Sequence, residues 1–261
     1  MPASSAPSLA ETFLSFLVMG LAVGLAWASR CLSHRHLPPR THRLVLECSG
    51  AFQICACTRE LRLLSTLPPQ PHTALALTYL STALHGRTLV GSVNNPSSSF
   101  QLLFKGRLAG TTWALHTSAQ FLGALAAHLF TRGAWMLGMT EAHARAQDEA
   151  CTSPLQTSVA HAFVLELLFS FLLHLMLLQF ESLSHQARSH LVALLITTLV
   201  YEGGHLTGAI FNPALAFSMH LNCFSEKFWN YILVYWIAPC LGSVLVVIAW
   251  DEILPLLHRE A

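Results

Sequence analysis

Seven long apolar stretches, joined by short polar segments, constrain this chain of 261 residues more than any other feature. A helix needs about 20 mostly apolar residues to cross a hydrocarbon core of about 30 Å. The stretches that approximate this requirement are residues 9–28, 44–64, 74–93, 113–130, 159–180, 191–206 and 228–250. No connecting segment is long enough to hold a separate soluble domain. The pattern therefore predicts a single all-α membrane domain.

The composition supports the same fold class. Only 10% of the residues are charged, whereas a soluble domain carries about 25%. The formal net charge of +1 gives no basic field that would attract nucleic acid, so we expect the lipid bilayer as a partner and no nucleic-acid ligand. The 7 cysteines and 15 histidines form no metal-ligand spacing, so no metal and no cofactor are expected.

The first stretch, residues 9–28, has two interpretations. Ala26-Trp27-Ala28 resembles a signal-peptidase site, but residues 1–13 contain no Lys or Arg, and a signal peptide should begin with a basic region. The basic residues follow instead, at Arg30, Arg35, Arg40 and Arg43. The positive-inside rule places this 30–43 segment in the cytosol. We favour an uncleaved extra helix over a removed signal.

The remaining sequence contains two similar halves. A single glutamate stands near the start of an apolar helix at Glu47 and again at Glu166. Asn95-Pro96 follows Glu47 by 48 residues, and Asn212-Pro213 follows Glu166 by 46 residues. Three spans per half, an odd number, place the second half upside down relative to the first. Inverted repeats with interrupted helices are how many transporters build a site at the bilayer midplane.

Each Asn-Pro pair predicts a helix that begins inside the membrane. Asn is a favoured N-cap residue, and Pro fits the first helical turn because its missing N–H has no partner there. A half-helix of about 8–10 residues rises roughly 12–15 Å, which is half of the bilayer core. Two half-helices from opposite faces would bring their positive dipole ends and both asparagine amides to the midplane. That arrangement favours a pore for neutral solutes that repels protons and cations.

Glu47 and Glu166 need a reason to lie in a span, because a carboxylate there is costly and is usually functional or paired. We expect each to accept hydrogen bonds from backbone N–H groups of a re-entrant loop. The alternative is that either lies near the headgroups and is solvated.

These residues resemble the aquaporin family over residues 42–252. Residues 206–214 are similar to the family's second Asn-Pro-Ala loop, residues 119–124 to its third-span motif, and residues 235–242 to its last span. The resemblance implies an aquaporin-like inverted repeat of two three-helix halves with two re-entrant half-helices, plus one extra N-terminal hydrophobic helix. Residues 1–41 then form the extra segment and basic loop, 42–252 the channel domain, and 253–261 a short tail.

Two departures from the family pattern concern the pore. The first box reads Asn95-Pro96-Ser97, whereas the second reads Asn212-Pro213-Ala214. Most aquaporins have an arginine directly after the second box, and this chain has Leu215. Counting back from Asn212 places Ala209 and Val200 at the other matching filter positions. The resemblance therefore implies an apolar and wider selectivity filter.

The degenerate first box, the clean second box and Cys223, nine residues after Ala214, look like the divergent intracellular branch of the family, the superaquaporins. By resemblance this branch implies a homotetramer in the endoplasmic reticulum membrane that passes water, glycerol and hydrogen peroxide. Cys151 lies in a loop on the same side as Cys223, and a lumen permits disulfides. A Cys151–Cys223 bridge is one possibility, and buried packing of Cys223 is the other.

The leading hypothesis is a passive channel for water and small neutral solutes. The changes at Ser97 and Leu215 motivate an alternative, a non-conducting or weakly conducting scaffold that retains the fold. A membrane enzyme is disfavoured, because no nucleophile–base pair stands out among the intramembrane polar residues. Glu202 and His205 come nearest to a reactive cluster, and we expect them at the non-cytosolic mouth.

Overall fold

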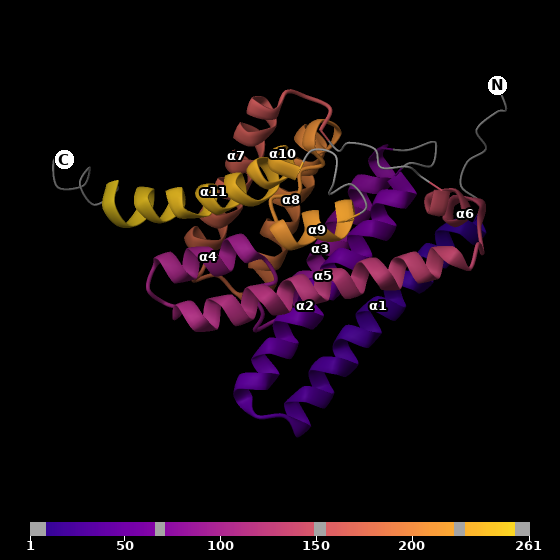
Figure 1. Cartoon of the computed structure of the whole chain (residues 1–261), viewed down its shortest axis with the longest axis horizontal. Coiled ribbons are helices and arrows are strands. Elements are labelled where there is room, and N and C mark those ends of the chain that lie inside the picture. Colours follow the sequence, from indigo (N-terminus) through magenta and orange to yellow (C-terminus); the bar gives the residue numbers. More distant parts are fainter. Residues whose placement is uncertain (1–8, 66–70, 149–154, 222–227, 254–261) are drawn as a thin grey trace.

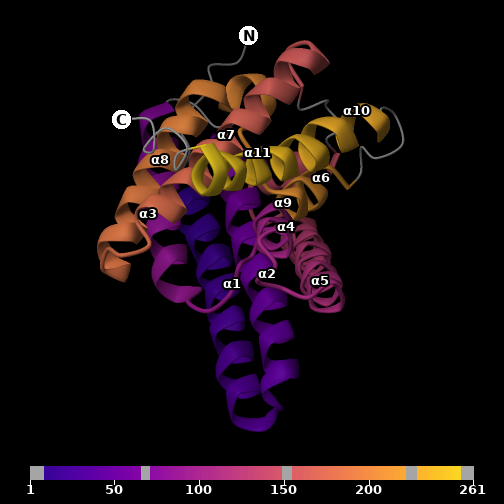
Figure 2. The ribbon, with the colours of Figure 1, turned by 90° about the vertical axis from the view of Figure 1, so that its left-hand side faces the viewer.

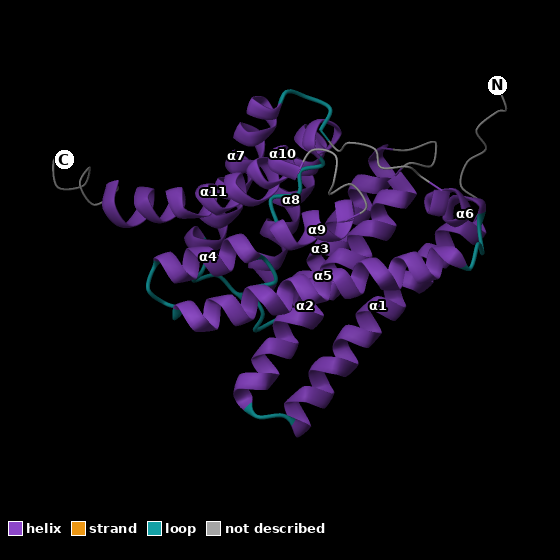
Figure 3. Ribbon diagram, in the orientation of Figure 1, coloured by secondary structure: helices purple, strands orange, loops and turns teal. Residues whose placement is uncertain are grey.

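The computed structural model describes residues 9–65, 71–148, 155–221 and 228–253, which are almost entirely helical (Figures 1 and 3). The helices up to residue 148 are α1 (Leu9–His36), α2 (Pro39–Ser65), α3 (Pro71–Thr88), α4 (Pro96–Phe104), α5 (Gly110–Met136) and α6 (Glu141–Asp148). Those after it are α7 (Val159–Gln179), α8 (His185–Thr207), α9 (Pro213–His220), α10 (Phe228–Ile232) and α11 (Ala238–Val247). Two π-helical segments, Leu233–Ile237 and Ile248–Ile253, make the last helix continuous.

The helices form two halves that make corresponding contacts. In the first half α2 packs along α5, and in the second half α7 packs along α11. α3 and α8 occupy the same place in each half and pack against each other. Each half-helix crosses over, so that α4 contacts α11 and α9 contacts α5. The predicted all-α fold of two inverted halves with two half-helices is confirmed.

Glycines at matching positions allow the two main helix pairs to approach closely. A Cβ atom on Gly123 of α5 would lie 2.1 Å from the Cys48 carbonyl oxygen of α2. A Cβ atom on Gly242 of α11 would lie 2.3 Å from the Leu167 carbonyl oxygen of α7. Helices in membranes associate through such backbone approach at small residues, because lipid supplies no hydrophobic force between them. The same contact thus holds each half together.

α1 and α2 form a long hairpin that projects beyond the other helices (Figure 2). The positive-inside argument treats residues 30–43 as a loop, but α1 continues to His36 and α2 begins at Pro39. Both helices extend past their apolar stretches because charged residues there are still compatible with a helix. The chain turns only at Pro38 and Pro39, because proline cannot continue α1 but fits the first turn of α2. α1 buries Ala22 and Ala26 against the bundle and exposes its larger apolar residues, including Trp27.

Length and composition alone select fewer spans than the predicted seven. Among the described residues, three helices are long and apolar enough to cross a bilayer: Glu11–His36, Val159–Gln179 and Phe228–Asp251. α2 carries Arg59 and Glu60 in its second half, and both side chains are buried. Charged groups in a membrane helix face other protein groups rather than lipid, because only there are they paired.

The buried pair on α2 joins three other helices. Arg59 donates to the Thr131 hydroxyl of α5 (2.6 Å) and to the Ser218 carbonyl of α9 (2.6 Å). Glu60 accepts from the Trp135 indole (2.5 Å), and its other oxygen lies 3.4 Å from His143 Nε2 of α6. Arg59 is thus an interior residue, although it is charged. The short helix α6, which the apolar pattern does not predict, is fixed to the bundle by this network.

Replacing Gly242 or Gly123 with alanine should destabilise the fold. The added methyl group would overlap a backbone oxygen of the facing helix. Relieving this overlap would require the two helices to move apart, and they would then lose other contacts. Overpacking of this kind costs about 1–3 kcal/mol. We expect a lower melting temperature in detergent, measured by size-exclusion chromatography after heating.

Gly133→Ala is the matched control for this experiment. Gly133 lies on α5 like Gly123, but its Cβ position has no heavy atom within 4 Å. The control should melt at or slightly above the wild-type temperature, since alanine favours a helix. Equal melting temperatures for all the variants would contradict the close-packing argument.

Candidate functional site

A cavity of about 810 Å³ runs through the centre of the bundle. Faces of α2, α3, α7 and α8 line it, together with both half-helices and the loops that precede them. Along α8 it extends from His185 in the first turn to His205 in the last. The helix between these two residues rises about 30 Å, which matches a hydrocarbon core of about 30 Å. The cavity therefore has the length of a transmembrane pore.

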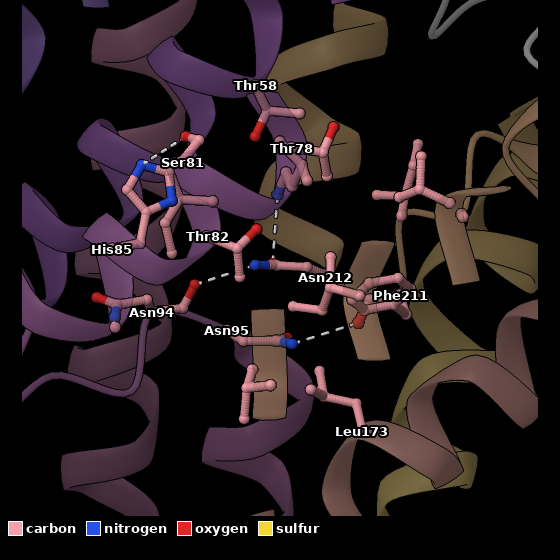
Figure 4. A pocket seen from close by; sticks show the side chains of 18 of the residues that line it. Thr58, Thr78, Ser81, Thr82, His85, Asn94, Asn95, Leu173, Phe211 and Asn212 are labelled. Atoms are coloured by element: carbon pink, nitrogen blue, oxygen red, sulfur yellow. Dashed lines mark hydrogen bonds between the residues drawn. The ribbon is translucent and has the colours of Figure 1, made fainter. Parts of the chain in front are cut away.

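The two predicted Asn-Pro boxes meet at this cavity (Figure 4). Asn95 caps α4 and its amide nitrogen donates to the Phe211 carbonyl (3.2 Å). Asn212 caps α9 and its amide nitrogen donates to the Asn94 carbonyl (3.1 Å). Each asparagine thus holds the loop of the opposite half. Pro96 and Pro213 are the first residues of their half-helices.

The side-chain oxygens of the two asparagines are already bound within their own half-helices. Asn95 Oδ1 accepts from the Ser97 backbone nitrogen (3.0 Å), and Asn212 Oδ1 accepts from that of Ala214 (3.0 Å). Each amide nitrogen carries two hydrogens and donates only one of them in these bonds. Both residues line the cavity, and the second hydrogen of each is not used in these bonds.

Ser97, the departure in the first box, fits this arrangement. Its side chain is fully buried, and its hydroxyl donates to Asn95 Oδ1 (2.7 Å). The hydroxyl therefore adds a hydrogen bond to the same oxygen that the backbone already holds. The serine strengthens the cap in place of the alanine found in the second box.

The loops before the two asparagines have the same unusual backbone. Gly91 and Gly208, four residues before each asparagine, have φ angles of 87° and 88°. The residues directly before each asparagine, Asn94 and Phe211, have φ angles of 60° and 35°. Non-glycine residues adopt positive φ at an energetic cost and do so mostly where the surroundings impose it.

Glu47 and Glu166 provide those surroundings. Glu47 accepts from the backbone nitrogens of Val93 (2.8 Å) and Asn94 (3.0 Å). Glu166 accepts from the equivalent nitrogens of Ile210 (3.1 Å) and Phe211 (2.6 Å). Their exposed fractions are 2% and 0%, so neither is a solvated headgroup residue in this structure. Each carboxylate pairs two backbone donors that no regular helix would satisfy.

Two further groups complete these networks and were missed from the sequence. The Gln120 amide donates to Glu47 (2.7 Å) and to the Ser99 hydroxyl of α4 (2.9 Å). The Thr207 hydroxyl donates to Glu166 (2.6 Å). Gln120 lies in the segment that resembles the third-span motif. A polar side chain within this apolar run was the one signal in the sequence that it has a buried partner.

The proposed filter residues Val200, Ala209 and Leu215 all line the cavity. Ala209 is held at a φ of 47°. Its backbone N–H donates to the Thr207 hydroxyl oxygen (3.1 Å), which fixes the backbone in this conformation. Leu75 of α3 also lines the cavity.

The charge along the cavity has one sign. Of the described residues that line it, Arg62 and Arg188 are basic, and none is Asp or Glu. Three histidines also line it, at positions 85, 185 and 205. Arg62, from the last turn of α2, lies near the proposed filter, since a Cβ atom on Gly208, next to Ala209, would lie 3.9 Å from its Nη1 atom. An electropositive lining disfavours cations throughout the cavity.

The cysteines take no part in the described cavity wall. Cys151 and Cys223 lie outside the described residues. The five described cysteines are free, and none of them lines the cavity. Glu202, named with His205 as the nearest approach to a reactive cluster, is exposed and does not line the cavity either.

Comparisons with known proteins agree with this architecture. Human aquaporin-11 is 42% identical over 245 residues, which cover 94% of this chain and 88% of that protein. Mouse aquaporin-12 is 36% identical over 220 residues, which cover 81% of this chain and 75% of that protein. The X-ray structure of the aquaglyceroporin from Plasmodium falciparum superposes with a TM-score of 0.70 at 18% identity, covering 85% of this chain and all of that one.

The family model for the major intrinsic proteins matches residues 9–250, which is nearly the whole chain. The match includes α1 and both half-helices. Together with the relatives above, it shows that this chain is a member of the major intrinsic protein family, the family of the aquaporins.

Proposed function

We propose that the chain is a passive channel for water and small neutral solutes, including glycerol and hydrogen peroxide. One observation carries the proposal: asparagine amides from two opposed half-helices face one cavity that extends along the whole of α8. The solute oxygen would accept hydrogen bonds from Asn95 and Asn212 at the centre. Membership of a channel family supports the same conclusion.

Proton and cation exclusion follows from the charges around the centre. Each half-helix N-terminus is equivalent to about half a positive charge, and two of them meet near Asn95 and Asn212. The basic residues Arg62 and Arg188 stand toward the two ends of the cavity. A cation would have to shed its water among these positive groups, whereas a neutral hydroxyl compound would not. Val200, Ala209 and Leu215 would set the width.

We further propose a homotetramer that resides in the endoplasmic reticulum membrane. The resemblance to the intracellular aquaporin branch supports both parts. The exposed apolar residues on α1, α5 and α8, such as Trp27, Leu122 and Leu194, suit lipid or a neighbouring protomer. Native mass spectrometry of the detergent-extracted protein tests the tetramer, and microscopy with a reticulum marker tests the compartment.

Reconstituted vesicles should take up water, glycerol and hydrogen peroxide faster than protein-free vesicles, with no potassium current. The neutral solutes can use the central amides, while potassium meets only positive charge. Stopped-flow light scattering measures the first two solutes, and an encapsulated peroxide probe measures the third. Rates equal to those of empty vesicles for all three solutes would favour the non-conducting scaffold.

Substitution of Glu166 or Glu47 by glutamine should lower the yield of folded protein. Glutamine has one acceptor oxygen in place of two, and its NH₂ group would face backbone N–H donors. An unsatisfied buried donor costs about 1–3 kcal/mol. Fluorescence-detected size-exclusion chromatography measures the folded fraction.

Glu202→Gln is the matched control, because Glu202 is exposed on α8. This variant should give the wild-type yield. Near-normal yield and solute flux for both Glu47→Gln and Glu166→Gln would remove the loop-supporting role of these carboxylates.

A further inference from the structure

A serine and a histidine form a polar pair in the cavity wall that the channel proposal does not use. Ser98 lies three residues after Asn95, just as Leu215 lies three residues after Asn212. Both positions line the cavity. The first half therefore presents a hydroxyl where the second half presents an isobutyl group. His174 of α7 lies behind the serine, with its Nε2 atom 2.8 Å from Ser98 Oγ.

The hydrogen bonds around His174 fix which ring nitrogen carries the proton. Nδ1 lies 2.7 Å from the Ser170 carbonyl oxygen, which can only accept. The Ser170 hydroxyl, 3.3 Å from the same nitrogen, gives its own hydrogen to the Pro239 carbonyl (2.7 Å). Both neighbours of Nδ1 are therefore acceptors, so Nδ1 must carry the hydrogen.

The other ring nitrogen is then an acceptor. The His174 side chain is 1% exposed, and a charged imidazole is disfavoured in such a position unless a counter-charge is close. In the neutral ring with hydrogen on Nδ1, Nε2 has only a lone pair. Ser98 must therefore donate its hydroxyl hydrogen to His174.

This donation leaves the Ser98 oxygen with its lone pairs and no hydrogen for the cavity. No other described residue forms a hydrogen bond with Ser98 Oγ. The centre of the cavity thus combines two kinds of group: amide donors at Asn95 and Asn212, and a fixed acceptor one helical turn away. A solute that both accepts and donates through hydroxyl groups can satisfy both kinds.

We infer that Ser98 is a binding site for the hydroxyl group of small alcohols such as glycerol, and that His174 is its positioning residue. The inference rests on the proposed channel function and adds a solute-recognising group to it. A glycerol hydroxyl would donate to Ser98 while another of its oxygens accepts from an asparagine amide. The apolar Leu215 in the other half offers no equivalent bond.

The test compares glycerol and water fluxes through the same reconstituted protein. In Ser98→Ala the ratio of glycerol to water flux should fall roughly fivefold, the effect of one lost hydrogen bond of about 1 kcal/mol. Ser98→Thr, which keeps the hydroxyl, should keep the wild-type ratio. Leu215→Ala is the contrasting variant at the equivalent position of the other half-helix. It widens the proposed filter without removing a hydrogen bond, so its ratio should rise.

The outcomes separate this inference from the channel proposal. A wild-type protein that passes neither solute rejects the channel function itself. A conducting protein in which Ser98→Ala raises or leaves the glycerol-to-water ratio overturns the hydroxyl site, because the serine then only fills space.

A second measurement does not depend on flux. Solid-state ¹⁵N NMR of histidine-labelled wild-type protein reports the tautomer of His174, assigned by the signal that is lost in His174→Gln. Hydrogen on Nδ1 and a bare, hydrogen-bonded Nε2 are expected. Hydrogen on Nε2 would make Ser98 a donor to the cavity and would overturn the inference.

Discussion

The carboxylates of Glu47 and Glu166 are what the rest of this structure depends on. Backbone that leaves the helical pattern at membrane depth has no water to satisfy it, so protein groups must do so. Each glutamate accepts from two consecutive N–H groups of one loop. Those bonds hold Asn94 and Phe211 at positive φ, which directs each loop into the first turn of its half-helix. The position of both asparagine amides follows from this pairing.

The sequence predicts this arrangement well because its determinants are local or periodic. A capping asparagine followed by proline favours a helix start, and similar distances to a preceding glutamate, 48 and 46 residues, indicate repetition. Groups contributed from distant helices are a different matter. Nothing in the chain near Gln120 or His174 tells which residue each one faces, because packing brings them together. The length of α1 was missed because its last turn, which includes Arg35, lies beyond the apolar stretch. The helix α6 was missed because its sequence is polar, and its position depends on the contact of His143 with Glu60 of α2.

The two halves match in backbone more closely than in side chains. Gly50 leaves space for the side chain of Asn94, and a Cβ atom there would lie 1.7 Å from Asn94 Oδ1. At the equivalent place in the second half Phe169 packs on Gly203, and a Cβ atom on that glycine would lie 2.3 Å from the ring. Ser98 and Leu215 differ in the same way. A symmetrical frame therefore supports a cavity to which the two halves contribute different side chains, which a purely symmetrical repeat would not provide.

The placement of the thiols has a consequence for redox chemistry. Cys55 is buried with its sulfur 3.8 Å from the Ala214 carbonyl of α9, and Cys57 lies beneath α1 with its sulfur 3.9 Å from the Met19 carbonyl. Oxidation of cysteine requires access for the oxidant and a thiolate. An oxidising solute in the described part of the cavity would meet the thioether of Met219 but no thiol. Oxidation of that side chain would be of the reversible, sulfoxide kind, whereas a cysteine at the same place could be oxidised irreversibly.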